Sequence, residues 1–149
     1  FESTIESDSA HLWPAVEALL EADLEIHCLR DLTRGGLAAA LLEIASSARL
    51  GFQVEESRIA VEEAVAGACE LLGLDPLHVA NEGRFIVILP AGEASRALEI
   101  LKETAPGGSR AARIGKVQSG EPGEVRMVSL IGVERILDRP SGEQLPRIC

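Results

Sequence analysis

The chain has 149 residues, of which 46% are hydrophobic, and this suffices for one well-buried core but not for two ordinary domains. Its 24 acidic and 14 basic residues give a formal net charge of −10, and no basic run could neutralise a row of phosphates, so nucleic acid is not an expected partner. No apolar run approaches the roughly 20 residues of a membrane span and no signal segment opens the chain, so we expect a cytoplasmic protein without a membrane partner.

The first third of the chain begins with Phe1 rather than Met, followed by an acidic polar stretch, so we expect a fragment whose natural beginning has been removed. Residues 12–22 repeat apolar side chains at helical spacing and predict a helix, in which Pro14 fits the first turn. Residues 25–29 alternate enough to predict a short strand.

Residues 37–45 have strong helix propensity and predict a helix. Because this helix would be apolar on almost every side, it should be buried. Asp31 or Thr33 stands where an N-cap oxygen is wanted just before it. Two glycines, Gly35 and Gly36, then permit a close backbone approach at the start of the helix.

Short strands and helices are expected in the middle of the chain. Residues 51–54 predict a strand, and residues 61–72 predict a helix that Gly73 should end. The expected apolar face of this helix consists of Val61, Val65, Ala68, Cys69 and Leu72. Pro76 suits the first position of a further helical turn. The apolar run at residues 85–89 predicts a buried central strand.

The last third of the chain is rich in β-structure after an amphipathic helix at residues 93–104. Three strand candidates separated by turns follow, at residues 111–117, 125–130 and 133–137. Because helices and strands intermix without a strict β-α-β rhythm, we expect residues 1–138 to form one α+β domain in which a mixed β-sheet is covered by helices. Residues 139–149 are polar and punctuated by Pro and Gly, which is typical of a mobile tail.

The three cysteines, Cys28, Cys69 and Cys149, match neither a zinc site nor a disulfide framework, so we expect reduced thiols. Cys28 and Cys69 lie within apolar periodicities, which is typical of core residues. The three histidines are scattered along the chain. The sequence therefore predicts no metal site.

Three stretches carry a resemblance to a known family. They are residues 30–37, residues 75–84 (Asp-Pro-Leu-His-Val-Ala-Asn-Glu-Gly-Arg) and the ending Pro146-Arg147-Ile148-Cys149. Together they resemble the C-terminal domain of HypE, a hydrogenase-maturation family in the superfamily of aminoimidazole ribonucleotide synthetase and selenophosphate synthetase. The first two stretches have counterparts across that superfamily, whereas the terminal Pro-Arg-Ile-Cys is particular to HypE. The resemblance runs along essentially the whole chain and leaves out the family's N-terminal domain.

The resemblance implies a role in making the cyanide ligand of the [NiFe]-hydrogenase iron centre. In this family a HypF-type carbamoyltransferase places a carbamoyl group on the terminal cysteine, which is Cys149 here. ATP with Mg²⁺ then drives dehydration of the thiocarboxamide to a thiocyanate, and the cyanide passes to a HypC–HypD scaffold. The family also implies a homodimer when full length. Since most of its ATP site lies in the N-terminal domain, the fragment alone should be inactive and bind no cofactor.

The chemistry of the ending agrees with such a role. A thiolate attacks a carbonyl carbon well, so Cys149 at a chain end could carry one group between two active sites. Pro146 stiffens the approach, Ile148 offers an apolar anchor and Arg147 can hold an anion, so this ending is a candidate for recognition of the tail. Without the family, an incidental exposed thiol would explain the terminal cysteine as well.

Dehydration also requires the nitrogen to lose both protons, for which a carboxylate base is suitable. Glu82, between Asn81 and Gly83 just before the apolar strand, is our candidate base, and we expect it to be partly buried there. The alternative is a loop glutamate that caps a turn.

The remaining candidates would form a wall that holds a phosphate or the tail, because a helix N-terminus with glycines offers N–H donors to an anion. They are Asp31, Thr33, Arg34, Gly35, Gly36 and Asn81. A capped helix start in a tight turn explains most of them equally well, and Asp31 is also a weaker candidate for holding magnesium.

Two other interpretations of the whole chain stay open. One is a non-catalytic carrier or docking module whose tail only presents the cysteine to partners. The other is a domain of a different synthetase of the same superfamily, although the purine-pathway and selenophosphate enzymes do not call for a terminal cysteine.

Overall fold

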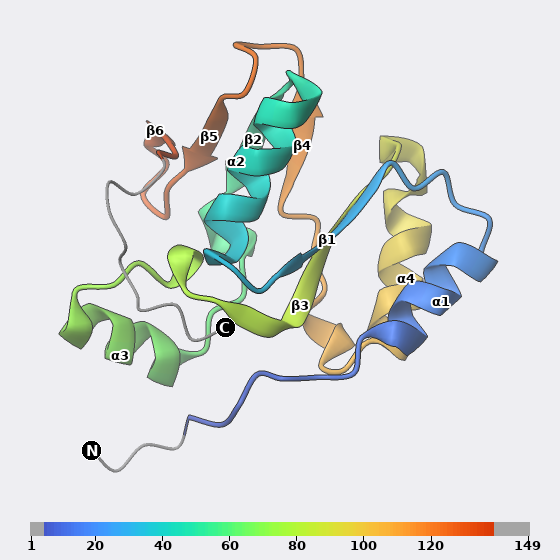
Figure 1. Ribbon diagram of the computed structural model, residues 1–149, viewed down its shortest axis with the longest axis horizontal. Coiled ribbons are helices and arrows are strands. Elements are labelled where there is room, and N and C mark those ends of the chain that lie inside the picture. Colours follow the sequence, from blue (N-terminus) through green and yellow to red (C-terminus); the bar gives the residue numbers. More distant parts are fainter. Residues whose placement is uncertain (1–4, 139–149) are drawn as a thin grey trace.

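Two β-sheets organise the part of the chain that the structure describes, residues 5–138 of a computed structural model (Figure 1). The smaller sheet pairs β1 (Cys28–Leu32) with β3 (Asn81–Ile88) in antiparallel fashion. Helices α1 (Trp13–Glu21) and α4 (Ala94–Thr104) lie side by side against one face of this sheet. Ala15 and Leu19 of α1 meet Ala97 and Leu101 of α4 in a buried cluster, which fixes both helices on the sheet.

The larger sheet has four strands, in the order β4 (Gly115–Gln118), β2 (Gly51–Glu55), β5 (Val125–Val128) and β6 (Glu134–Ile136). β2 and β5 run parallel, whereas the other neighbours are antiparallel, so the sheet is mixed. This arrangement confirms the expected α+β class, although the strands divide into two sheets.

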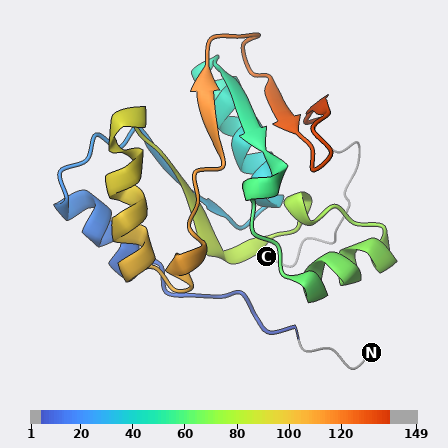
Figure 2. The same ribbon diagram turned by 180° about the vertical axis from the view of Figure 1, so that it is seen from behind.

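Helix α2 (Gly36–Ala48) lies on one side of the four-stranded sheet, as Figure 1 and Figure 2 show from opposite directions. Its buried residues pack on Phe52, Val54 and Met127 of the sheet, each at most 4% exposed. The expected burial of this helix is confirmed. It is a 13-residue helix, whereas the apolar pattern predicted nine of those residues.

Helix α3 (Glu63–Leu72) packs less than its apolar pattern predicted. Only Cys69 is buried, and Leu71 and Leu72 are 72% and 70% exposed. Gly73 ends the helix in a left-handed conformation (φ 68°), as expected. A 3₁₀ turn, η2 (Pro76–His78), then begins with the Asp75 side chain accepting a hydrogen bond from the Leu77 N–H. No helix within residues 5–138 has the length and apolar character to cross a membrane.

The expectation of a central strand at residues 85–89 is wrong for the described residues, because β3 pairs with β1 alone. Its continuous apolar run has another cause. Phe85 and Val87 pack toward the cluster of α1 and α4, while Ile86 and Ile88 pack toward the core around α2. The two-stranded sheet therefore lies between two hydrophobic clusters, and each of its faces is half-buried.

The first strand was also expected too early in the chain, at residues 25–29, whereas β1 is Cys28–Leu32. Ile26 is held in a local turn, with its N–H donating to the Leu24 carbonyl. The pairing begins where the His27 N–H donates to the carbonyl of Ile88, so the position of β3 decides where β1 starts.

Candidate functional site

The Asn-Glu-Gly-Arg motif lies inside β3, at an irregularity in its pairing with β1. Asp31 is opposite Phe85, yet the next residue, Leu32, is opposite Asn81. Residues 82–84 therefore have no partner in β1 and form a bulge beside the end of that strand. Bulges of this kind re-aim side chains and occur often next to active sites. The pairing brings two predicted site segments together, although they are far apart in the sequence.

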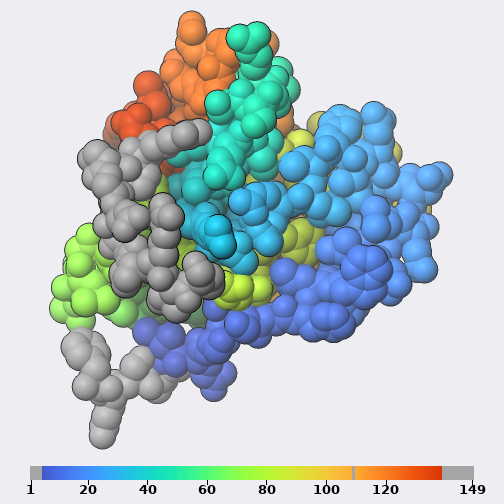
Figure 3. Space-filling view, in the orientation of Figure 1, coloured from blue at the N-terminus to red at the C-terminus, as the bar shows by residue number. Residues whose placement is uncertain are grey.

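Glu82 is exposed, so the expected partial burial is wrong for the described part of the chain. Its backbone N–H donates to Oδ2 of Asp8, at 2.8 Å, although 74 residues separate the two. The segment around Asp8 also passes close to Gly83, where a Cβ atom would lie 1.7 Å from the Asp8 carbonyl oxygen. Figure 3 shows this segment, in dark blue, along the lower part of the face that also displays the start of β3 in yellow-green. The carboxylate of Glu82 is thus open to a substrate while its backbone is held.

Asn81, the residue before Glu82, has a less exposed side chain than Glu82. Its side-chain oxygen, Oδ1, is buried and has no hydrogen-bond partner among residues 5–138. Buried acceptors are nearly always satisfied in folded proteins. An N–H donor brought by a ligand or by another part of the protein would satisfy this one.

Asp31 and its neighbours form a small polar network. Arg30 forms a close ion pair with Asp31 and also reaches Oε2 of Glu43 on α2, at 3.2 Å from Nη2. The Thr33 hydroxyl donates to Oδ1 of Asp31 at 3.3 Å. Arg34 is exposed and has no hydrogen-bond or ion-pair partner within the described residues. Its guanidinium is thus available to an anion.

The expected side-chain cap on α2 is wrong. The N-cap is Gly35, in a left-handed conformation (φ 68°), and no side chain caps the helix. Thr33 is turned instead toward Asp31, which belongs to β1. Gly36 does provide the expected close backbone approach, because a Cβ there would lie 2.4 Å from the carbonyl oxygen of Val79 and 2.6 Å from that of Leu77, whereas a Cβ on Gly35 would meet only Ala39 of the same helix. Packing of α2 on the segment around η2 therefore accounts for Gly36.

A substitution of Gly36 at this contact should lower the stability of the fold. We expect Gly36→Ala to lower the free energy of unfolding by about 3 kcal/mol, because the methyl group would meet two backbone carbonyls and the residue has φ of 61°. Urea unfolding followed by circular dichroism measures the change. The matched control is Gly67→Ala in α3, where a Cβ meets nothing within 4 Å, and which should stabilise the helix by about 0.5–1 kcal/mol. Equal effects of the two substitutions would contradict the packing role of Gly36.

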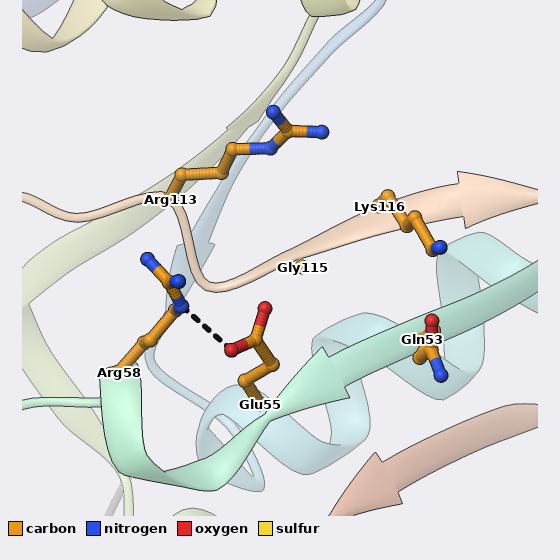
Figure 4. Close-up of a pocket in the computed structure, with 6 residues that line it drawn as sticks. All are labelled: Gln53, Glu55, Arg58, Arg113, Gly115 and Lys116. Atoms are coloured by element: carbon orange, nitrogen blue, oxygen red, sulfur yellow. Dashed lines mark hydrogen bonds and ion pairs between the residues drawn. The ribbon is translucent and has the colours of Figure 1, made fainter.

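An open groove lies elsewhere, at the edge of the four-stranded sheet (Figure 4). It is lined by Gln53, Glu55, Arg58, Arg113, Gly115 and Lys116. In the close-up, Glu55 lies between Arg58 and β4, and its Oε2 pairs with Nε of Arg58 at 2.7 Å. None of the predicted site residues lines this groove. The candidate site is therefore the surface around the bulge of β3.

The predicted tail, residues 139–149, lies outside the described residues, and with it Pro146, Arg147, Ile148 and Cys149. The other two cysteines are free thiols, with Cys28 half-buried and Cys69 buried. Among residues 5–138, no three Asp, Glu, His or Cys side chains gather closely enough to hold a metal ion.

Sequence reasoning missed Asp8, Arg30 and Glu43 as neighbours of the site. Their contacts depend on strand register and on a chain crossing, which leave no local pattern. Gly83 was the available signal, because a glycine inside a strand often marks a bulge or a close backbone approach.

Comparison with known proteins gives matches along the whole chain. The family model described as "AIR synthase related protein, C-terminal domain" matches residues 2–128. Over 149 residues the chain is 51% identical to the carbamoyl dehydratase HypE of Azotobacter vinelandii, a match that covers 100% of this chain and 43% of that protein. A crystal structure of hydrogenase maturation protein HypE in complex with ATP superposes with a TM-score of 0.92 and 46% identity, over 100% of this chain and 45% of that one. A HypE–HypF complex superposes with a TM-score of 0.86 and 39% identity, over 94% of this chain and 45% of that one.

These matches confirm the resemblance that the sequence motifs indicated, and the superpositions confirm the α+β fold. The chain spans less than half the length of the relatives it matches.

Proposed function

The chain belongs to the family of AIR synthase related proteins, as their C-terminal domain, and we propose that it is the C-terminal part of a carbamoyl dehydratase of the HypE kind. The observation that carries this proposal is the 51% identity to such a protein in a match that covers the entire chain. We propose that residues 1–138 form the domain and that residues 139–149 form a tail that presents Cys149.

The proposed reaction takes place on the Cys149 sulfur. A carbamoyl group is held there as S–C(=O)–NH₂, and its carbonyl oxygen accepts the γ-phosphoryl group of ATP. The C–O bond then breaks and phosphate leaves with that oxygen, while the nitrogen gives up both of its protons and the carbon–nitrogen bond becomes a triple bond. The products are the S–C≡N adduct, ADP and phosphate, with one proton ending on phosphate and the other released.

We assign the proton transfer to Glu82. Its carboxylate is exposed beside the end of β1, so a group carried on a chain end can reach it. The neighbouring Asn81 Oδ1 is a buried acceptor without a partner within residues 5–138, and it would accept one N–H of the carbamoyl group. Together they would orient the NH₂ group and remove its protons, which is the part of the reaction that a fixed carboxylate can accelerate.

The phosphate side of the reaction is assigned to the surface before α2. Arg34 offers an exposed cation there, with Thr33 and Gly35 beside it. Asp31 is already paired with Arg30, so we do not assign magnesium to it. Mg²⁺ accompanies ATP in the whole protein, and we propose that its ligands come from outside the described residues.

The proposed partners follow from the same relatives. The structure of a HypE–HypF complex supports a HypF-type carbamoyltransferase as the donor of the carbamoyl group. A HypC–HypD scaffold as the acceptor of cyanide, a homodimer of the whole protein and a cytoplasmic location are further parts of the proposal.

The test is intact mass spectrometry of the whole protein with its carbamoyltransferase partner, carbamoyl phosphate and ATP. We expect a carbamoyl adduct that converts to a lighter cyano adduct, both located on Cys149 by fragmentation. An adduct that forms and never converts would favour the carrier module instead. If no adduct formed on Cys149, the proposal would be wrong, and the chain would instead be a domain of a superfamily enzyme that acts on another substrate.

A further inference from the structure

The segment that precedes α1 passes over β3 at Glu82, the proposed general base. Asp8 lies in this segment, and its carboxylate oxygen Oδ2 accepts the backbone N–H of Glu82 at 2.8 Å. Directly beside this bond, Gly83 leaves room for the Asp8 main chain, whose carbonyl oxygen lies 1.7 Å from where a Cβ would be. A hydrogen bond and a close steric fit therefore both hold the segment around Asp8 against β3.

The bulge explains why Glu82 needs such a contact. Strand β1 pairs with Phe85 and with Asn81, and it provides no partner for residues 82–84. The N–H of Glu82 would otherwise depend on water for an acceptor, and its backbone could shift within the bulge. A carboxylate is a strong acceptor for this donor, because a hydrogen bond with an ionised partner is stronger than one between neutral groups.

The geometry points to Asp8 as a positioning residue for Glu82. Its carboxylate fixes the backbone of Glu82 within the bulge, so that the exposed carboxylate of Glu82 stays where it can take a proton from the substrate nitrogen. Catalytic groups must be held to within about 0.5 Å of their productive position, and the pairing with β1 leaves Glu82 without a strand partner to hold it. This inference rests on the proposed function, since it assigns Asp8 a role in the same reaction.

The crossing segment itself is ordered locally. The Ser9 N–H donates to the Ser7 hydroxyl oxygen at 3.3 Å, so the chain turns at Asp8 and directs its carboxylate to β3. Glu6 belongs to the same segment and is exposed, with no hydrogen-bond or ion-pair partner among residues 5–138. It provides a matched control, because its loss removes the same charge without touching Glu82.

The first test measures the single-turnover rate at which the carbamoyl adduct on Cys149 becomes the cyano adduct in the whole protein. Asp8→Ala should slow this conversion about tenfold while leaving the extent of carbamoylation unchanged. Asp8→Asn should restore a rate close to the native one, because its amide oxygen can accept the same N–H. Glu6→Ala should match the native protein. Equal slowing by Asp8→Ala and Asp8→Asn, or by Asp8→Ala and Glu6→Ala, would overturn the positioning role.

The second test does not depend on activity. Amide hydrogen exchange of the peptide that contains Glu82, measured on the whole protein, should be about tenfold faster in Asp8→Ala and unchanged in Glu6→Ala. Gly83→Ala should also speed this exchange, because its methyl group displaces the Asp8 main chain. Unchanged exchange in Asp8→Ala would overturn the inference while leaving the proposed function intact. Normal protection of Glu82 in a native protein that never forms the cyano adduct would overturn the proposed function, and the positioning role with it.

Discussion

The whole protein carrying Cys149→Ala is expected to form neither the carbamoyl adduct nor the cyano adduct, a complete loss of both. Alanine has no thiolate to attack the carbamoyl donor, and no other group on the chain end can replace it. The other cysteines are poorly placed to substitute, because Cys28 is half-buried at the start of β1 and Cys69 is buried in α3. Intact mass spectrometry after incubation with the carbamoyltransferase partner, carbamoyl phosphate and ATP measures both adducts.

Cys28→Ala is the matched control for this loss, since it removes one thiol from the same chain at a position embedded in the fold. It should leave both adducts at native levels. A carbamoyl adduct that persisted in Cys149→Ala and disappeared in Cys28→Ala would reverse the assignment and move the acceptor into the domain.

Local patterns in the sequence were enough to predict several elements. The apolar run before Ala48 predicted the buried helix α2, and Gly73 predicted the end of α3. The pattern at residues 93–104 predicted α4, which begins at Ala94. In each case the signal is a helical repeat or a backbone requirement of one residue, so neighbours in the sequence carry it in full.

The features that depend on contacts between distant segments could not be predicted in this way. Apolar residues at helical spacing suggested a packed face on α3 that included Cys69 and Leu72, yet only Cys69 is buried and Leu72 is exposed, because packing depends on which element lies opposite. The apolar run of β3 suggested a central strand, whereas it results from two hydrophobic clusters that pack on opposite faces of a two-stranded sheet. For α2, the polar residues nearest its start were expected to cap it, but the pairing of β1 with β3 draws Asp31 into the strand.

In the candidate site, too, the features carried by local motifs were predicted, whereas those that depend on contacts between distant segments were not. The sequence identified Asn81 and Glu82 through their motif, and the structure brings them beside Asp31 by strand pairing. It could not predict that Glu82 is exposed or that Asp8 accepts its backbone N–H, because both result from a bulge and from a contact across 74 residues.

Glu82→Gln is expected to leave carbamoylation of Cys149 at the native level and to slow formation of the cyano adduct by about a hundredfold or more. Glutamine has nearly the same shape as glutamate but cannot take up a proton, so the change removes the base and little else. Because the Glu82 carboxylate is exposed and makes no hydrogen bond or ion pair within residues 5–138, the substitution should not disturb the bulge or the hydrogen bond that the Glu82 backbone N–H donates to Asp8.

The two steps separate the role of Glu82 from a general loss of folding or of partner binding. Carbamoylation requires a reachable Cys149 and a partner that recognises the chain, whereas conversion also requires the proton to leave nitrogen. Glu99→Gln on the exposed side of α4 is the matched control and should convert at the native rate. A time course of both adducts by mass spectrometry distinguishes the cases. Equal loss of both adducts in Glu82→Gln would indicate damage to the domain, and conversion at the native rate would mean that the protons on nitrogen leave to a group other than Glu82.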